Sequence, residues 1–207
     1  MAGCPAAEQG DRVPHFGAGG WLPYLEDVYE RQWEQSIGPY WSDLAAFAAS
    51  QNPDLLVCLE LHPGTSAFNV ETFERVAGLG TSLAANLDPS HFFWMGMDGH
   101  KVAERLGRLV GHSHGKDTVF HADSLALNGL LDRRWPRPAE QMPWNFAVPG
   151  RGHDQIWWTG LMRSLATSRV QVISIEHEDP FVHPEAGIPE AARLLKNAIE
   201  AAQEVTA

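Results

Sequence analysis

Four short apolar segments, each ending in an acid or a histidine, constrain the fold of this chain most strongly. They lie at residues 54–61, 82–87, 109–114 and 170–176. The first, DLLVCLEL, is almost continuously apolar, as in a strand that is buried on both faces of a sheet. Segments with helical periodicity alternate with these runs. The order α-βα-βα-βα-βα therefore predicts an α/β protein with a parallel sheet.

The helices are predicted from the spacing of their apolar residues. Trp33, Ile37 and Trp41 recur at helical spacing, and Gly38-Pro39 should kink or split that helix. The stretch 115–153 is rich in turn residues and is predicted to be a long βα loop. We expect one domain over residues 1–207. The predicted helices cover about 26–50, 70–78, 98–107 and 154–167, with a last one starting near Pro189.

The strand ends carry the candidate metal ligands. Glu60, Asp88, His114 and Glu176 each lie where a predicted strand passes into a loop. The carboxyl ends of parallel strands meet at one face, which in a β/α barrel is the active face. Two Glu, one Asp and one His suit a divalent cation such as Mn, Mg, Co or Zn. The first three candidates are 28 and 26 residues apart, each about one βα unit.

Two of these strand ends carry a second histidine. Glu60 and His62 would share one face of a strand and could point into one pocket. A strand-end acid that caps a turn is an equally plain interpretation. Asp88 is followed at i+3 by His91, and two potential ligands so close favour a site. The alternative is that Asp88 caps a turn before Pro89 while His91 packs in the core.

The third strand end carries several polar residues. His112, His114 and Lys116 would share a face, and Asp117 follows them. A neutral histidine is a good metal ligand, and a nearby lysine can stabilise an oxyanion or a phosphate. Exposed strand ends rarely combine these residue types, so we favour a functional site.

Two further assignments leave alternatives open. Glu176 and Glu178 would share a face, so either could be the ligand, and Glu176 lies closer to the buried strand. Arg151, in the sequence GRGH, could bind an anionic or hydroxylated substrate group. A simple glycine turn explains that segment equally well.

Composition excludes several classes of partner. The chain has 15 basic and 26 acidic residues, a formal net charge of −11, which disfavours nucleic acid and anionic membranes as partners. No apolar run reaches the roughly 20 residues of a membrane span. The N-terminal sequence lacks the features of a signal peptide. Two cysteines, Cys4 and Cys58, are too few for a disulfide framework. We therefore expect a cytoplasmic protein.

The motifs LELHPG, NLDPSHFFWMGMD, GHSHGKDT and SIEHEDP resemble the sugar phosphate isomerase/epimerase family. This family belongs to the xylose isomerase-like barrel superfamily, which also includes tagatose epimerase-type enzymes, inosose dehydratase and endonuclease IV. The resemblance implies a metal held by Glu60, Asp88, His114 and Glu176. It also implies that Glu60 and Glu176 move the substrate proton and that His91 lies beside the substrate or a second metal.

The resemblance also implies an incomplete barrel. AGCPA at residues 2–6 is similar to the segment that ends the fourth strand in the family. We therefore expect a partial (β/α)8 TIM barrel that corresponds to the second half, N-terminally truncated relative to the family. Such a chain would leave sheet edges and apolar surface uncovered. We accordingly expect a homo-oligomer.

The predicted function is metal-dependent isomerisation or epimerisation of a small sugar, sugar phosphate or polyol. One glutamate removes the substrate proton and the other returns it, through an enediolate. The predicted substrate-binding residues are His62, His91, His112, Lys116, Asp117 and Arg151. The alternatives are a truncated paralogue that binds a metal or a partner without turnover, and a phosphodiesterase similar to endonuclease IV, which the acidic charge disfavours.

Overall fold

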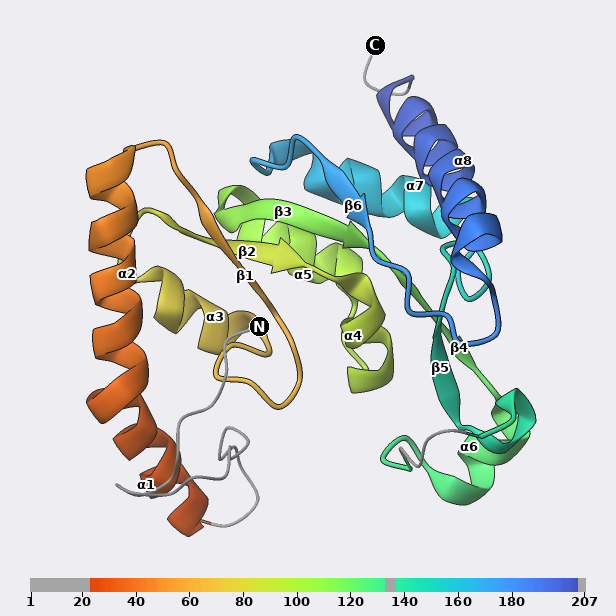
Figure 1. The fold of residues 1–207 in the computed structure, drawn as a ribbon, viewed down its shortest axis with the longest axis horizontal. Helices are drawn as coiled ribbons and strands as arrows, with labels where there is room; N and C mark the ends of the chain where they lie inside the picture. The colour runs from red at the N-terminus through yellow and green to blue at the C-terminus, as the bar shows by residue number, and fades with distance from the viewer. Residues whose placement is uncertain (1–22, 133–136, 205–207) are drawn as a thin grey trace. The chain divides into compact units, whose positions relative to one another are not determined.

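The computed structural model describes residues 23–132 and 137–204 (Figure 1). The AGCPA segment at residues 2–6 lies outside the described residues. Four strands form a sheet in the order β1-β2-β3-β6, and β4 and β5 form a second sheet. The pairs β1–β2 and β3–β6 are parallel, whereas β4 and β5 are antiparallel. The α/β class and the parallel sheet are confirmed, consistent with a partial TIM barrel.

The strands are short. Their bounds are β1 Val57–Glu60, β2 Leu83–Leu87, β3 Val110–Gly115, β4 Asp117–Phe120, β5 Trp144–Ala147 and β6 Ile173–Ile175. The α-helices are α1 Pro23–Gln32, α2 Gly38–Gln51, α3 Val70–Ala77, α4 Pro89–Met95, α5 Gly99–Leu106, α6 Ala122–Asn128, α7 Gln155–Ser164 and α8 Pro184–Gln203. A π-helical segment, η1 Trp33–Ile37, and three 3-10 segments, η2 Gly107–Leu109, η3 Ala139–Gln141 and η4 Leu165–Thr167, complete the order.

The chain divides into two compact units. Among the described residues, unit 1 consists of 23–87 and 108–112, and unit 2 consists of 88–107, 113–132 and 137–204. In unit 1, η1 joins α1 to α2, so the helical hydrogen-bonding pattern changes just before Gly38-Pro39. This confirms the predicted interruption of the first helix. The buried core of unit 1 includes Leu59, Phe73, Val76, Leu83 and Ala84.

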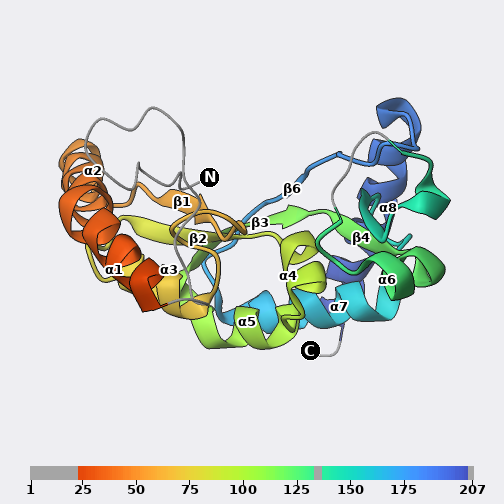
Figure 2. The ribbon, with the colours of Figure 1, turned by 90° about the horizontal axis from the view of Figure 1, so that it is seen from below.

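In unit 2, α7 packs against both α5 and α8. Figure 2 shows α5 and α7 next to each other along one side of this unit. The core of unit 2 includes Phe92, Trp158, Leu161, Leu195 and Ala198. None of the helices in the described ranges is long and apolar enough to cross a membrane.

Three elements differ from the sequence-based expectation. The stretch 115–153 is not only a loop, because β4 and β5 pair within it and α6 lies between them. A helix, α4, follows β2 directly, where only a turn was expected. The last helix begins at Pro184 with His183 as its N-cap, so Pro189 lies inside it. Pro184 and Pro189 both fall in the early turns of α8. The prediction that the helix starts near Pro189 was therefore wrong, because it starts at Pro184.

Candidate metal centre

Asp88 has two roles at the junction of β2 and α4. It follows Leu87, the last residue of β2, and is the N-cap of α4, where Oδ1 accepts the Ser90 N–H at 2.9 Å. Pro89 occupies the first turn, where its missing N–H has no cost. The Asp88 side chain is completely buried. The cap leaves the second oxygen, Oδ2, to face the neighbouring basic side chains.

Oδ2 of Asp88 is surrounded by three nitrogens. It lies 3.1 Å from Lys116 Nζ, 3.5 Å from His114 Nδ1 and 3.6 Å from His91 Nε2. Burial by itself raises the pKa of Asp88. The hydrogen bond from His114 and the charges of His91 and Lys116 outweigh burial, so that the pKa falls below its usual value. The group is therefore a carboxylate at neutral pH, the form that binds metals.

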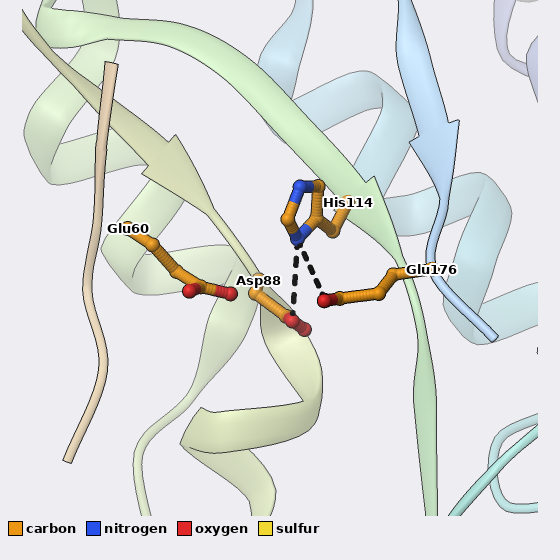
Figure 3. A group of neighbouring side chains, drawn as sticks. All are labelled: Glu60, Asp88, His114 and Glu176. Atoms are coloured by element: carbon orange, nitrogen blue, oxygen red, sulfur yellow. Dashed lines mark ion pairs between the residues drawn. The ribbon is translucent and has the colours of Figure 1, made fainter. Parts of the chain in front are cut away.

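Glu176 and Glu178 lie just beyond β6 and reach the same cluster. Oε2 of Glu176 is 3.0 Å from His114 Nδ1 and 2.7 Å from Lys116 Nζ, and Oε2 of Glu178 is 2.9 Å from Lys116 Nζ. Figure 3 shows the side chains of Asp88, His114 and Glu176 pointing toward one another. One ligand atom from each of these three lies within 4.8 Å of the others.

Lys116 is a buried cation held by carboxylates. Its side chain is 2% exposed and contacts Asp88, Glu176 and Glu178. Its Nζ also lies 4.5 Å from the centre of the Phe146 ring. Burial by itself lowers the pKa of Lys116, but the three carboxylates raise it well above its usual value. Lys116 therefore stays protonated and supplies fixed positive charge.

His91 occupies the first turn of α4. Its side chain is almost fully buried and forms an edge-to-face contact with Phe146, with ring centres 5.4 Å apart. The alternative interpretation of this strand end is thus confirmed, because Asp88 caps a helix and His91 packs in the core beside it. The functional roles of both residues stay predictions.

Three candidates belong to unit 1. Glu60 is the last residue of β1 and pairs in register with Asn86, two residues before Asp88. His62 lies 2.7 Å from the Pro63 carbonyl oxygen through Nδ1. His112 is half-buried in the part of β3 that belongs to this unit. The ligand role of Glu60 and the substrate roles of His62 and His112 stay predictions.

Asp117 holds a glycine-rich loop. Its fully buried carboxylate accepts hydrogen bonds from the backbone N–H groups of Thr118, Gly150, Gly152 and His153, at 2.8–3.1 Å. Oδ1 also lies 2.7 Å from Nδ1 of His153. These contacts organise the loop after β5.

Arg151 lies in the same loop. It makes a bidentate contact with Glu190 of α8, at 2.9 and 3.0 Å, on the exposed surface. The structure thus gives both Asp117 and Arg151 contacts within the protein, and their substrate roles remain predictions.

Sequence reasoning missed the residues of β5. Trp144, Asn145 and Phe146 line a cavity together with Glu178. The segment was expected to be loop because its prolines and glycines dominate the pattern. The short aromatic run WNFA was the available signal for a strand.

The donor set fits a divalent cation. Carboxylate oxygens and an imidazole nitrogen are suitable ligands for Mn, Mg, Co or Zn. Asp88 is also oriented by a residue outside the proposed ligand set, because its Oδ1 accepts the Ser90 N–H. The arrangement can thus hold a metal beside a protonated lysine.

Comparison with known proteins agrees with the fold. The sequence profile of the xylose isomerase-like TIM barrel family matches residues 5–198. An uncharacterized protein, YfiH of Bacillus subtilis (strain 168), is 34% identical over 203 residues, which cover 96% of this chain and 64% of that protein.

Two solved structures share the fold at 17% identity. The probable 3-DHS dehydratase AsbF from Bacillus anthracis, involved in petrobactin synthesis, has a TM-score of 0.58, covering 88% of this chain and 60% of that one. A xylose isomerase domain protein from Alicyclobacillus acidocaldarius has a TM-score of 0.54, covering 88% and 70%. The chain thus spans less than two thirds of YfiH and AsbF. With most of its length matched by the family profile, the chain belongs to the xylose isomerase-like TIM barrel family.

Proposed function

We propose that this protein is a divalent-metal-dependent isomerase or epimerase that acts on a small sugar, sugar phosphate or polyol. The observation that carries the proposal is the convergence of Asp88, His114 and Glu176 around the buried Lys116. Carboxylates that bind a metal and also exchange protons suit isomerisation next to a carbonyl group.

The proposed metal ligands are Asp88, His114 and Glu176, with Glu60 as the fourth. Glu60 is included because its register partner, Asn86, lies two residues before Asp88. A bound Mn, Mg, Co or Zn ion would polarise neighbouring carbonyl and hydroxyl oxygens of the substrate.

Proton transfer is assigned to Glu60 and Glu176. His114 and Lys116 both contact Oε2 of Glu176, so Oε1 is the oxygen that would take the proton and return it. Lys116, protonated and water-excluded, stabilises negative charge that develops on substrate oxygens. His62 and His91 would orient substrate hydroxyl groups.

The proposal also covers the binding partner, the cellular location and the oligomeric state. The partner is a small-molecule substrate, and the strongly acidic composition argues against nucleic acid and anionic membranes. A cytoplasmic location and a homo-oligomeric state remain part of the proposal.

The test is exchange of the substrate α-hydrogen with solvent deuterium, followed by NMR on a ketose panel. Exchange should require added metal. Glu176→Gln should slow it by about 10²-fold or more, because the proton acceptor is lost. The control is Glu185→Gln, whose side chain is 91% exposed and whose exchange rate should equal that of the wild type.

Two results would redirect the proposal. Undiminished exchange in Glu176→Gln with excess metal would move the proton-transfer role to Glu178 or elsewhere. Metal binding without exchange of any ketose would favour a paralogue that binds metal without turnover.

A further inference from the structure

Lys116 has partners of two kinds. Asp88 and Glu176, whose oxygens lie 3.1 and 2.7 Å from Nζ, belong to the proposed metal ligands. Glu178, at 2.9 Å, and the face of the Phe146 ring, at 4.5 Å, do not. The three carboxylate oxygens match the three N–H groups of an ammonium, which has no acceptor. The two kinds of partner differ in what a metal would do to them.

The first kind of partner would be shared with a metal. The Lys116 ammonium contacts Oδ2 of Asp88 and Oε2 of Glu176. The same two oxygens contact Nδ1 of His114, the third proposed ligand in this unit. A divalent ion held by these side chains would draw on the carboxylates that neutralise Lys116. Two cations that use the same carboxylates repel each other, most strongly where water is excluded.

The second kind of partner lies outside that competition. Glu178 follows Glu176 by two residues, and its side chain is 50% exposed. The Lys116 side chain is only 2% exposed, so water cannot replace a carboxylate that it loses. A buried ammonium without any carboxylate would carry the cost of an unpaired charge. A carboxylate and a ring face that belong to Lys116 alone reduce this cost.

We propose that Glu178 is a positioning residue that holds the Lys116 ammonium and thereby frees Asp88 and Glu176 to bind a divalent cation. Phe146 assists through its ring face. This deepens the proposed function and rests on its metal centre. The sequence left open whether Glu176 or Glu178 is the ligand. Their contacts give them different roles, because Glu176 touches both His114 and Lys116, whereas the described ion pair of Glu178 is with Lys116.

The experiment measures the Mn²⁺ affinity of the full chain by isothermal titration calorimetry. Glu178→Gln should weaken binding by about tenfold or more, because Lys116 then depends on Asp88 and Glu176 alone. Lys116→Met should tighten binding by about tenfold, because the competing cation is removed. Glu185→Gln is the matched control, since its side chain is 91% exposed, and it should leave the affinity unchanged.

The combined variant separates positioning from simple charge. In a Lys116→Met background, Glu178→Gln should change the Mn²⁺ affinity by less than about threefold, since no ammonium is left to hold. Phe146→Leu removes the ring face without removing a charge. It should weaken binding by about two- to fivefold in the wild type and have no effect in Lys116→Met.

Two measurements guard against effects on folding. Glu178→Gln should melt within a few degrees of the wild type in EDTA, because the side chain is half-exposed. If Lys116→Met fails to fold, Lys116→Gln replaces it, because an amide still donates to carboxylates. If neither folds, Glu178→Gln and Phe146→Leu decide in the wild type, where unchanged affinity in both overturns the inference and weaker binding in both supports it.

The outcomes separate the two proposals. An equal loss of affinity from Glu178→Gln with and without Lys116 overturns the inference, because charge acting through space would explain it. Weaker binding in Lys116→Met also overturns it, since Lys116 would then not compete. In both cases intact metal-dependent exchange leaves the proposed function standing. The expected affinities without exchange of any ketose support the inference and overturn the proposed reaction. Absence of Mn²⁺ binding by the wild type overturns both.

Discussion

At the scale of single residues, Asp88 caps a helix with one carboxylate oxygen and leaves the other available for the proposed metal. Oδ1 caps α4 through the Ser90 N–H, and Oδ2 faces Lys116 and His114. Helix capping thus orients the carboxylate before any metal binds. A capping interpretation and a ligand interpretation of such a residue are therefore compatible.

Removal of Asp88 or of His114 should abolish most metal binding. Asp88→Ala and His114→Ala each delete a donor from the proposed set of four, and we expect an affinity loss of at least tenfold for each. Mass spectrometry of bound metal after dialysis provides the measurement. Asp123→Ala is the matched surface control. Full metal occupancy in both ligand variants would show that the ion binds elsewhere.

Replacement of Asp117 should destabilise the protein. Asp117→Asn converts an acceptor-only group into one with a donor facing backbone N–H groups, which leaves buried donors unpaired. We expect a loss of roughly 2–4 kcal/mol in the free energy of unfolding. Urea denaturation measures it.

The neighbouring acid gives a control for Asp117. Asp154 is exposed and caps α7 through the Trp157 N–H at 2.9 Å. Asn is as good an N-cap as Asp, so Asp154→Asn should change stability by less than about 0.5 kcal/mol. Equal effects of the two substitutions would contradict the loop-holding role of Asp117.

At the scale of elements, the backbone of the loop after β5 passes very close to the backbone of β4. A Cβ added at Gly152 would overlap the Thr118 carbonyl oxygen and lie 2.7 Å from Asp117 Oδ1. The glycines of this loop therefore let its N–H groups reach the Asp117 carboxylate. The close approach to Asp117 therefore explains the glycines of GRGH without any contact to a substrate.

Gly152→Ala should be much more destabilising than Gly129→Ala. Gly129 has φ +69° and ψ 174°, a conformation that is nearly restricted to glycine, with open space around it. An alanine there therefore meets backbone strain alone, about 1–3 kcal/mol. Gly152→Ala forces a clash with the Thr118 backbone, roughly 1–3 kcal/mol or more. It also displaces loop N–H groups from the buried Asp117 carboxylate, which should cost about 1–3 kcal/mol further. Thermal melting of the two variants compares them. A smaller cost at Gly152 would mean that β4 and the loop can separate easily.

At the scale of the whole molecule, the edge strand β6 offers a surface for self-association. It ends the described sheet, and the adjoining Val172 is 63% exposed. A cavity of about 450 Å³ next to it is lined in part by Ile173, Met162 and Ile199. Unpaired edges and exposed apolar surface favour pairing with another chain.

We therefore predict a homodimer, or a chain that aggregates when alone. Light scattering should show a mass above that of the monomer at micromolar concentration, and Val172→Lys should shift it toward the monomer. Thr167→Lys outside the cavity lining is the control. A monodisperse monomer that melts in one cooperative transition would refute the association and support the predicted single domain.

The sequence by itself determined the alternation of strands and helices and the candidates at the strand ends. Apolar runs such as 83–87 are buried on both faces and end abruptly at a polar residue, so local pattern was sufficient. Only the tertiary structure decided the partners of Lys116, the Asp117 contacts and the β4–β5 hairpin. Apart from the contact of Asp117 with the adjacent Thr118, these features join residues that lie 24 to 62 positions apart and meet only after folding. Local periodicity therefore cannot predict them.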